Sequence, residues 1–349
     1  MTKPQVTPFE LTLRAPVQTA QGAMRVRRGF VIRFPGGGTG EATPLEEFGT
    51  ESLEACQQAL ERFELRDDAG SLDAVDAALG GLDGTPAARA GLELALLDRL
   101  ALQRGVPLVE LLGGSVDATL ACGALLAGET ADALLRNATA LVEQGFRTLK
   151  VKIGRRPLIQ EAQRLLAIRR AVGPDVRLRV DANGTCTEGE ARTALRAVES
   201  LDLELCEQPV AAGDLEGLSR LRGYVPCLIA VDEGLLVPGQ RPRLFDTERP
   251  RVADVAVLKP MALGGLRRAQ ALAAALAERK VDSYVTTLLD GPIARAGAAA
   301  VAAAMPATSL AHGLSTVELF EGVPPDACTP QRGAIHLPRV AGHGVTWAV

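Results

Sequence analysis

Aromatic residues and excess positive charge are both scarce in this sequence of 349 residues. Phe, Trp and Tyr make up 3% of the chain, and 38 Lys and Arg residues are set against 42 Asp and Glu residues, for a formal net charge of −4. Nucleic-acid binding needs clustered basic side chains for the phosphates and often aromatic side chains for the bases. The composition therefore argues against a nucleic-acid partner and favours a soluble globular protein.

Long apolar runs are also lacking. The N-terminal residues MTKPQVTPFE contain no apolar segment of signal-peptide length. The stretch most like a membrane segment, 296–305 (AGAAAVAAAM), is too short to span a bilayer and is rich in Ala rather than Leu. We predict a packed helix there, no membrane partner and a cytoplasmic protein.

Two further sequence signals are missing. The six cysteines contain no CxxC pair or other metal-ligand spacing, so we expect them to pack as small apolar residues in a reducing compartment. Neither GxGxxG nor GxxxxGK[ST] occurs, and the glycines of 35–38 (PGGG) join two strand-like segments as a turn. This argues against an open, doubly wound nucleotide-binding sheet.

Three carboxylates are the most informative residues that are present. Asp181, Glu207 and Asp232 each close a short apolar run, and they are spaced 26 and 25 residues apart. That spacing is about one strand–helix–strand step. The carboxyl ends of such strands converge at the mouth of a parallel barrel. Three converging oxygen donors suit a hard divalent cation such as Mg²⁺.

The organisation of the chain changes near residue 118. Before it, segments 9–14, 28–34 and 39–42 have strand patterns, and 50–65 and 85–104 have helical patterns. After it, helical patterns alternate with strand-like runs at 119–126, 147–153, 177–181, 203–207, 227–232, 253–258, 281–287 and, shorter, near 308–311. We predict an α/β fold with a small α+β domain over 1–117, a closed parallel barrel over 118–315 and a segment, 316–349, that returns to the first domain.

Lysines form a second group. Lys150 and Lys152 lie on one face of their strand because side chains alternate across a strand. Two ammonium groups on one face repel each other, which should lower both pKa values and suit a general base. Lys259 ends the sixth strand-like run and is followed by Pro260. We expect it to enter the same mouth from the opposite side.

Other polar residues near these positions are weaker candidates. Asn183 follows Asp181 by two residues, within reach of a metal or a ligand, and Glu233 adjoins Asp232, within reach of Lys152. Asp290 follows the seventh strand-like run. It is as compatible with an N-terminal cap of the next helix as with a place in the site.

The order of these motifs resembles the muconate-lactonizing branch of the enolase superfamily over essentially the whole chain. The matching motifs are KVK at 150–152, Asp181, Glu207 with Gln208-Pro209, Asp232-Glu233 and Lys259-Pro260. The resemblance implies a (β/α)7β TIM-like barrel covered by an α+β capping domain formed by the N-terminal part and the C-terminal tail. It also implies that the three acids hold Mg²⁺, with Mn²⁺ as a substitute, and that a lysine removes a proton α to the carboxylate of a small substrate. No His occurs in 233–311, which sets aside the mandelate-racemase branch.

Both ends of the chain favour one function within the branch. Segments 38–53 (GTGEATPLEEFGTESL) and 311–322 (AHGLSTVELFEG) resemble the o-succinylbenzoate synthases, lyases of menaquinone biosynthesis. N-succinylamino acid racemases often carry Arg where this chain has Ala262, and dipeptide epimerases carry an acidic pair that Asp290 alone does not make. We predict an o-succinylbenzoate synthase. The alternatives are an N-succinylamino acid racemase, a dipeptide epimerase or a muconate cycloisomerase, and, from a different class, a barrel protein without catalysis.

The resemblance also implies a role for each lysine. Lys152 abstracts the α-proton, Lys150 lowers the pKa of Lys152, and Lys259 stabilises the enediolate. We expect segments 18–28 and 44–50 to close over the substrate, with Arg25, Arg27 or Arg28 meeting a carboxylate of its tail. A homo-oligomer is compatible with the sequence.

Overall fold

A computed structural model describes residues 1–19, 22–66, 69–128, 130–154 and 156–348. Within the described residues, eight parallel strands form a nearly closed barrel in the order β10-β9-β8-β7-β6-β5-β4-β11. One backbone bridge, between Thr286 and Gly313, links β10 to β11 across the remaining seam. The strands are β4 (Thr119–Leu126), β5 (Thr148–Lys152), β6 (Arg177–Asp181), β7 (Leu203–Glu207), β8 (Leu228–Val231), β9 (Val255–Leu258), β10 (Asp282–Val285) and β11 (His312–Ser315).

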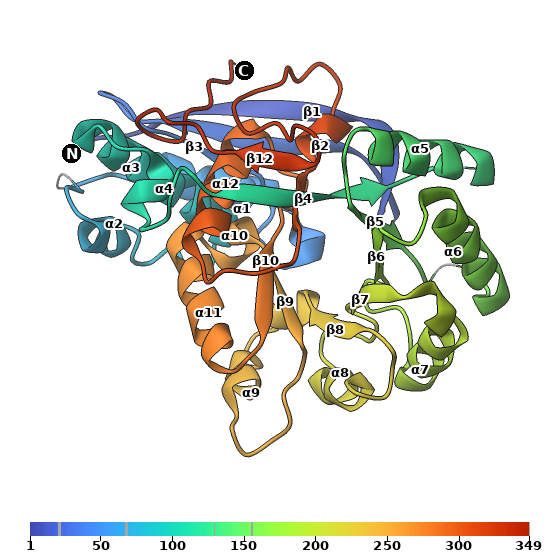
Figure 1. Ribbon diagram of the computed structural model, residues 1–349. Coiled ribbons are helices and arrows are strands. Elements are labelled where there is room, and N and C mark those ends of the chain that lie inside the picture. Colours follow the sequence, from blue (N-terminus) through green and yellow to red (C-terminus); the bar gives the residue numbers. More distant parts are fainter. Residues whose placement is uncertain (20–21, 67–68, 129, 155, 349) are drawn as a thin grey trace.

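Helices follow the barrel strands in alternation and cover the outside of the barrel (Figure 1). They are α5 (Ala131–Glu143), α6 (Leu158–Val172), α7 (Glu188–Ala197), α8 (Leu215–Leu221), α9 (Arg241–Phe245), α10 (Pro260–Leu263), α11 (Leu266–Glu278) and α12 (Pro292–Ala304), with 3₁₀ turns η2 (Glu199–Leu201) and η3 (Glu233–Leu235). The predicted (β/α)7β order is confirmed. The Ala-rich stretch forms the buried helix α12, and no described helix combines the length and apolar character that a membrane span requires.

The N-terminal part forms a cap of sheet and helices. Strands β1 (Gln5–Thr19), β2 (Gly22–Arg33) and β3 (Thr39–Ala42) make an antiparallel sheet, followed by η1 (Glu46–Phe48), α1 (Leu53–Arg62), α2 (Leu72–Ala78), α3 (Pro86–Arg104) and α4 (Leu108–Leu111). Gly40 of β3 lies so close to α3 that a Cβ atom would sit 2.0 Å from the Gly91 carbonyl oxygen. The contact needs glycine, because any larger residue would push the sheet off the helix.

The C-terminal segment lies along the cap sheet and also touches the barrel (Figure 1). Its 3₁₀ turn η4 (Val317–Leu319) precedes Phe320, which bridges Leu13 of β1, and the ring of Trp347 packs edge-on against Phe9. Strand β12 (Ala334–His336) pairs with β4. The domain limits 1–117, 118–315 and 316–349 stay a prediction, which these cap contacts support.

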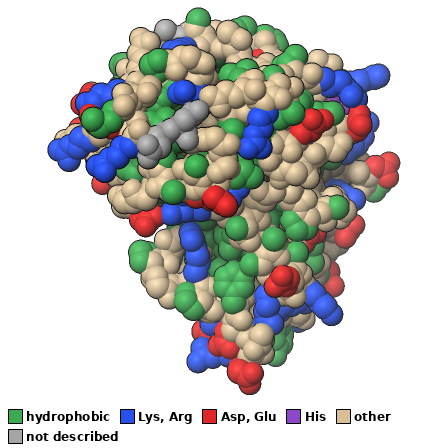
Figure 2. Space-filling model, turned by 90° about the vertical axis from the view of Figure 1, so that its left-hand side faces the viewer, with side chains coloured by type: hydrophobic (Ala, Val, Ile, Leu, Met, Phe, Trp, Pro, Cys, Tyr) green, Lys and Arg blue, Asp and Glu red, His purple; other side chains and the backbone are tan. Residues whose placement is uncertain are grey.

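Three local predictions differ from the structure. Strands β1 and β2 are longer than the predicted segments 9–14 and 28–34. The last barrel strand begins at His312 rather than near 308, because Thr308 bonds to Asp282 and to the Leu310 amide in a turn before the strand. Helix α2, capped by Ser71, was not predicted from the sequence. All six cysteines are described and none forms a disulfide. On the face shown in Figure 2, acidic and basic side chains are interspersed, in keeping with the absence of a basic excess.

Candidate active site

A cavity of about 220 Å³ opens at the carboxyl ends of the barrel strands, against the cap. Val17 and Met24 of the β1–β2 hairpin and Leu45, Glu47 and Phe48 of the segment after β3 line one side. The strand ends of the barrel line the rest. The predicted closing segments 18–28 and 44–50 therefore both contribute residues to the wall of this cavity.

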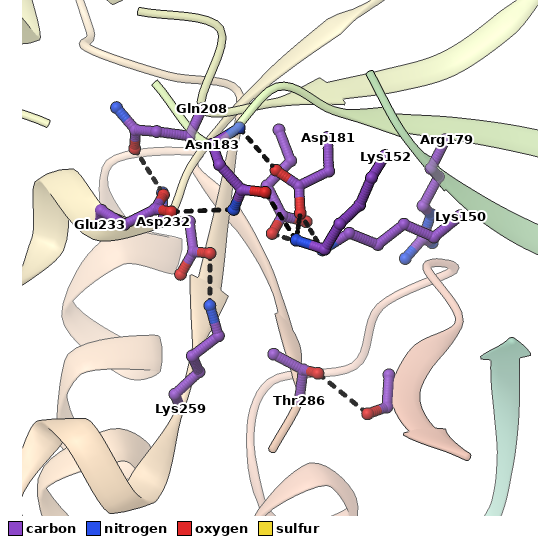
Figure 3. A network of polar contacts seen from close by, with 12 residues as sticks. Lys150, Lys152, Arg179, Asp181, Asn183, Gln208, Asp232, Glu233, Lys259 and Thr286 are labelled. Carbon is purple, nitrogen blue, oxygen red and sulfur yellow. Dashed lines mark hydrogen bonds and ion pairs between the residues drawn. The ribbon is translucent and has the colours of Figure 1, made fainter. Parts of the chain in front are cut away.

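Strand register brings the predicted residues together in one row. Lys152 pairs with Asp181 between β5 and β6, and Asp181 pairs with Glu207 between β6 and β7. Asp232 and Lys259 follow immediately after β8 and β9. Asp181, Glu207 and Asp232 are almost fully buried. Figure 3 shows Lys259 on one side of the acidic groups and Lys150 and Lys152 on the other.

The lysines are paired with the carboxylates. Lys150 Nζ lies 2.9 Å from Asp181 Oδ2 and 2.6 Å from Glu207 Oε1. Lys152 Nζ donates to Asp181 Oδ2 at 3.2 Å and to Asn183 Oδ1 at 2.6 Å. Lys259 Nζ donates to Asp232 and lies 4.0 Å from the centre of the Phe48 ring. Cap residue Phe48 thus covers the lysine that enters from β9.

The expectation of a depressed Lys150 pKa is wrong for this arrangement. Burial lowers the pKa of Lys150, but Asp181 and Glu207 outweigh it and raise the pKa well above its usual range. The same contacts hold the pKa of Asp181 below its usual range against the opposite effect of burial. Repulsion between lysines is a smaller effect here than attraction to carboxylates within hydrogen-bond distance.

Asn183 and Glu233 extend this network. Asn183 adopts a left-handed backbone conformation (φ 45°). Its Oδ1 accepts a hydrogen bond from the Lys152 ammonium, and its Nδ2 donates one to Glu233 Oε1 at 3.0 Å. In the described contacts Glu233 therefore reaches Lys152 through Asn183, and not directly as predicted. Gln208 is fully buried, and its Oε1 accepts hydrogen bonds from the backbone N–H groups of Asp232 and Gly234. These two bonds fix the start of η3.

Two residues at the cavity floor were missed from the sequence. Tyr284 of β10 donates its hydroxyl to Glu207 Oε2 at 2.5 Å, and burial raises the pKa of this phenol well above its usual range. The Arg179 guanidinium lies 4.6 Å from the centre of the Tyr284 ring. Alternation along β6 puts Arg179 on the same face as Asp181, which is the signal that would have found it. Nothing in the sequence marks Tyr284 as a partner of Glu207.

The remaining candidates are not among the described residues that line the cavity: Arg25, Arg27, Arg28 and Asp290. Arg27 is buried and donates to the backbone carbonyls of Thr43, Pro44 and Leu289, Arg28 pairs with Glu10 on the surface, and Arg25 is exposed. Asp290 is buried, with its pKa raised to about 7 by burial and by Glu41, and Arg27 opposing. The start of α12 is capped instead by Glu41, which accepts the N–H groups of Gly291, Ile293 and Ala294.

The acidic residues fit a divalent cation in their chemistry, as a cluster of carboxylate oxygens at the cavity. Among the described residues, no three His, Cys, Asp or Glu side chains are arranged to hold a metal ion as they stand. Lysine ammonium groups lie against the carboxylates and supply the balancing charge. The Lys150 ammonium lowers the pKa of Glu207 against the effect of burial, while burial and neighbouring acids raise the pKa of Asp232 well above its usual range. Clustered hard oxygen donors of this kind are those that Mg²⁺ prefers.

A capped parallel barrel with buried acids and lysines at its mouth defines a class of barrel enzymes. Comparison with known proteins identifies the family. Residues 133–348 match the family model "Enolase C-terminal domain-like". The L-Ala-D/L-Glu epimerase of Bacillus subtilis (strain 168) is 32% identical over 309 residues, which cover 86% of this chain and 82% of that protein. The chain belongs to the enolase superfamily.

Other relatives support the same assignment. Muconate cycloisomerase 1-2 of Acinetobacter lwoffii is 31% identical over 323 residues, covering 88% of this chain and 82% of that protein. The substrate-liganded L-Ala-D/L-Glu epimerase structure from Bacillus subtilis superposes with a TM-score of 0.89 at 26% identity, covering 98% of this chain and 97% of that one. A dipeptide epimerase from Enterococcus faecalis V583, complexed with Mg and L-Leu-L-Tyr, gives 0.87 at 25% identity, covering 98% and 99%.

Proposed function

We propose that this protein is a Mg²⁺-dependent racemase or epimerase that moves the proton α to the carboxylate of an N-acylated amino acid. The observation that carries the proposal is the placement of Lys152 and Lys259 on opposite sides of one acidic cluster (Figure 3). Inverting a carbon centre requires one group to remove a proton from one face and another to return a proton to the other face. The relatives named above are epimerases and cycloisomerases, which favours this isomerase alternative over the lyase predicted first.

The proposed roles follow from the contacts of each side chain. Lys152 is held by Asp181 and Asn183, and Lys259 by Asp232 and the Phe48 ring, so both ammonium groups have fixed positions at the cavity. We assign the proton transfers on the two faces to Lys152 and Lys259. Lys150 is bonded to two acids, Asp181 and Glu207, and is proposed to balance their charge.

Asp181, Glu207 and Asp232 are the proposed metal ligands. When bound there, Mg²⁺ supplies positive charge that stabilises the negative charge that develops on the substrate carboxylate. The cap contributes by excluding water, since Val17, Met24, Leu45 and Phe48 present apolar surface to the cavity.

The far end of the cavity favours an uncharged acyl group. Its described lining from the ends of β10 and β11 consists of hydroxyl and apolar residues: Thr286, Thr287, Leu288, Leu289, Gly313, Ser315 and Thr316. Thr287 and Thr316 share a hydroxyl hydrogen bond of 2.7 Å, and Thr286 donates to the Gly313 carbonyl. Within this described lining, no carboxylate meets the free ammonium that a dipeptide carries, since Asp290 lies behind the wall.

The test is a panel of N-acetyl and N-succinyl amino acids and dipeptides, incubated with the protein and Mg²⁺ in D₂O. We expect loss of the α-proton signal by NMR together with appearance of the opposite configuration. Lys152→Ala and Lys259→Ala should each exchange label into only one configuration. A wild-type protein that binds Mg²⁺ but exchanges no α-proton on any member of the panel would exclude the proposed reaction.

The second candidate is the o-succinylbenzoate synthase of menaquinone biosynthesis. The end segments 38–53 and 311–322 favour it, whereas the described far wall offers no positive charge to the carboxylate of its succinyl tail. It uses the same proton removal by Lys152 but then expels a hydroxyl group. Adding its β-hydroxy acid substrate to the panel and following an aromatic product by absorbance separates the two. Lactone formation from a muconate would point instead to the cycloisomerase reaction.

A further inference from the structure

The cavity floor holds an aromatic residue in direct contact with a proposed metal ligand. Glu207 is fully buried, and each of its carboxylate oxygens has a partner. Lys150 Nζ lies 2.6 Å from Oε1, and the Tyr284 hydroxyl donates to Oε2 at 2.5 Å. The two partners differ in kind: a lysine has a long flexible stem, whereas a tyrosine ring packed in a barrel has little freedom.

The ring of Tyr284 is held firmly from both sides. It packs within the barrel among Leu205, Ala230 and Val257, in an apolar cluster that lies inside the strands. The Arg179 guanidinium covers the ring at 4.6 Å from its centre. Arg179 is itself 3% exposed, so its position is fixed by protein contacts and not by solvent.

A β-bulge supplies the anchor for Arg179. Leu178 pairs with Leu203 but Arg179 pairs with Leu205, so Glu204 is an extra residue on β7. Bulges of this kind redirect a side chain, and here Glu204 Oε2 accepts Arg179 Nε at 2.5 Å. Arg179 Nη1 also donates to the Ala311 carbonyl at 2.7 Å. A continuous set of contacts thus runs from the bulge on β7 through Arg179 and Tyr284 to Glu207.

We propose that Tyr284 is a positioning residue that holds the Glu207 carboxylate in the orientation needed to bind Mg²⁺, and that Arg179 fixes the ring of Tyr284. The inference rests on the proposed metal site. With Oε2 bonded to the hydroxyl, Oε1, which shares the Lys150 ammonium with Asp181, becomes the oxygen released when that ammonium moves away. Groups that orient metal ligands in this way typically contribute about 10–100-fold to metal affinity.

The chain offers a matched control, because it has two tyrosines. Tyr224 also lies under a guanidinium, with Arg192 at 4.7 Å from its ring centre, but it is 55% exposed and is not among the described residues that line the cavity. Tyr284→Phe removes only the hydroxyl and keeps the ring. Calorimetric titration with MgCl₂ should show affinity weakened about 10–100-fold in Tyr284→Phe and unchanged in Tyr224→Phe. Arg179→Lys, which keeps the charge but loses the planar contact, should weaken Mg²⁺ binding less.

A spectroscopic readout separates positioning from a general loss of structure. Mg²⁺ should change the near-ultraviolet absorption of a tyrosine in the wild type and in Tyr224→Phe, and this difference band should vanish in Tyr284→Phe. Equal Mg²⁺ affinity of Tyr284→Phe and the wild type, or an equal loss in Tyr224→Phe, overturns the inference while leaving the proposed function standing. A wild-type protein without Mg²⁺ affinity overturns both.

Discussion

Two groups of buried carboxylates in this protein show how differently the same side chain is used. Asp181, Glu207 and Asp232 face lysine ammonium groups at the edge of a cavity. Glu41, Glu51 and Glu93 belong to the cap and accept backbone N–H groups at the starts of helices α12, α3 and α11. The first group has partners that can move away, and the second has partners that cannot.

Two members of the second group, Glu41 and Glu93, hold the cap and the barrel together. Glu41 binds three N–H groups of the loop and first turn of α12, and Glu93 binds those of Leu266 and Arg267 at α11. A helix N-terminus stabilises negative charge through its unpaired N–H groups and its dipole. Burial of a carboxylate is therefore no sign of chemistry by itself. The group that is bonded to the carboxylate distinguishes the two cases. A buried carboxylate at a cavity indicates a functional site when a ligand can displace its partner.

The sharpest test of this difference is removal of a lysine from the first group. Lys152→Ala should lower α-proton exchange by about 10²–10⁴-fold, the usual contribution of a general base, for the substrate configuration whose proton faces Lys152, while Lys259 still serves the other configuration. Thermal unfolding and Mg²⁺ affinity should stay close to wild type, because Asp181 keeps Lys150 as a partner. The matched control is Lys3→Ala, a surface lysine paired with Glu64. Wild-type exchange of both configurations in Lys152→Ala would refute the assignment of the base.

A pH profile tests the second group. Burial raises the pKa of Glu93 to about 7 from an ordinary value of 4.5, against the opposing effect of Arg89. The folded state therefore binds more protons than the unfolded state between these values, and its stability falls as pH rises from about 4.5 to 7. We expect the free energy of unfolding of the wild type to lose about 3 kcal/mol over that window relative to Glu93→Gln. Parallel profiles for the two proteins, measured by urea unfolding, would contradict this.

Metal addition should distinguish the two groups. At a Mg²⁺ concentration 100 times its dissociation constant, binding to the folded state alone stabilises the protein by about 2.7 kcal/mol. Asp232→Asn should abolish this rise in melting temperature, whereas Glu93→Gln should keep it. Equal Mg²⁺ responses in all three proteins would show that the metal binds elsewhere.

The smallest expected effect concerns a single cap contact. Glu51 accepts the N–H groups of Ala87 and Ala88 at 3.0 and 2.7 Å, at the start of α3. Glu51→Gln keeps the shape but loses the charge, and should cost about 1 kcal/mol of stability. Glu46→Gln, at an exposed position nearby, should cost nothing measurable in the same chemical unfolding experiment. A Glu51→Gln variant as stable as the wild type would show that the charge of Glu51 does not contribute measurably to stability.

The sequence was most informative where local pattern and tertiary position coincide. Asp181, Glu207 and Asp232 end successive strands, so their regular spacing alone predicted that they would meet. Glu41 and Glu93 carry no such signal, because the helix starts that they bind lie more than 170 residues away in the chain. Arg27 was misassigned because the choice between lining a cavity and bonding to a distant backbone carbonyl depends on how the cap sits on the barrel. Tyr284 was missed because its partner, Glu207, lies 77 residues away on another barrel strand.

The pairing of lysines with acids also bears on the order of binding. At a pH where Asp232 and Glu233 are ionised despite their raised pKa values, the charged residues that line the cavity leave one net negative charge, with five carboxylates (Glu47, Asp181, Glu207, Asp232, Glu233) against four cations (Lys150, Lys152, Arg179, Lys259). An anionic substrate is repelled by that charge, and a divalent cation reverses its sign. We therefore expect the cation to enter first and the carboxylate second, so that kinetics at limiting Mg²⁺ should show an ordered and not a random mechanism.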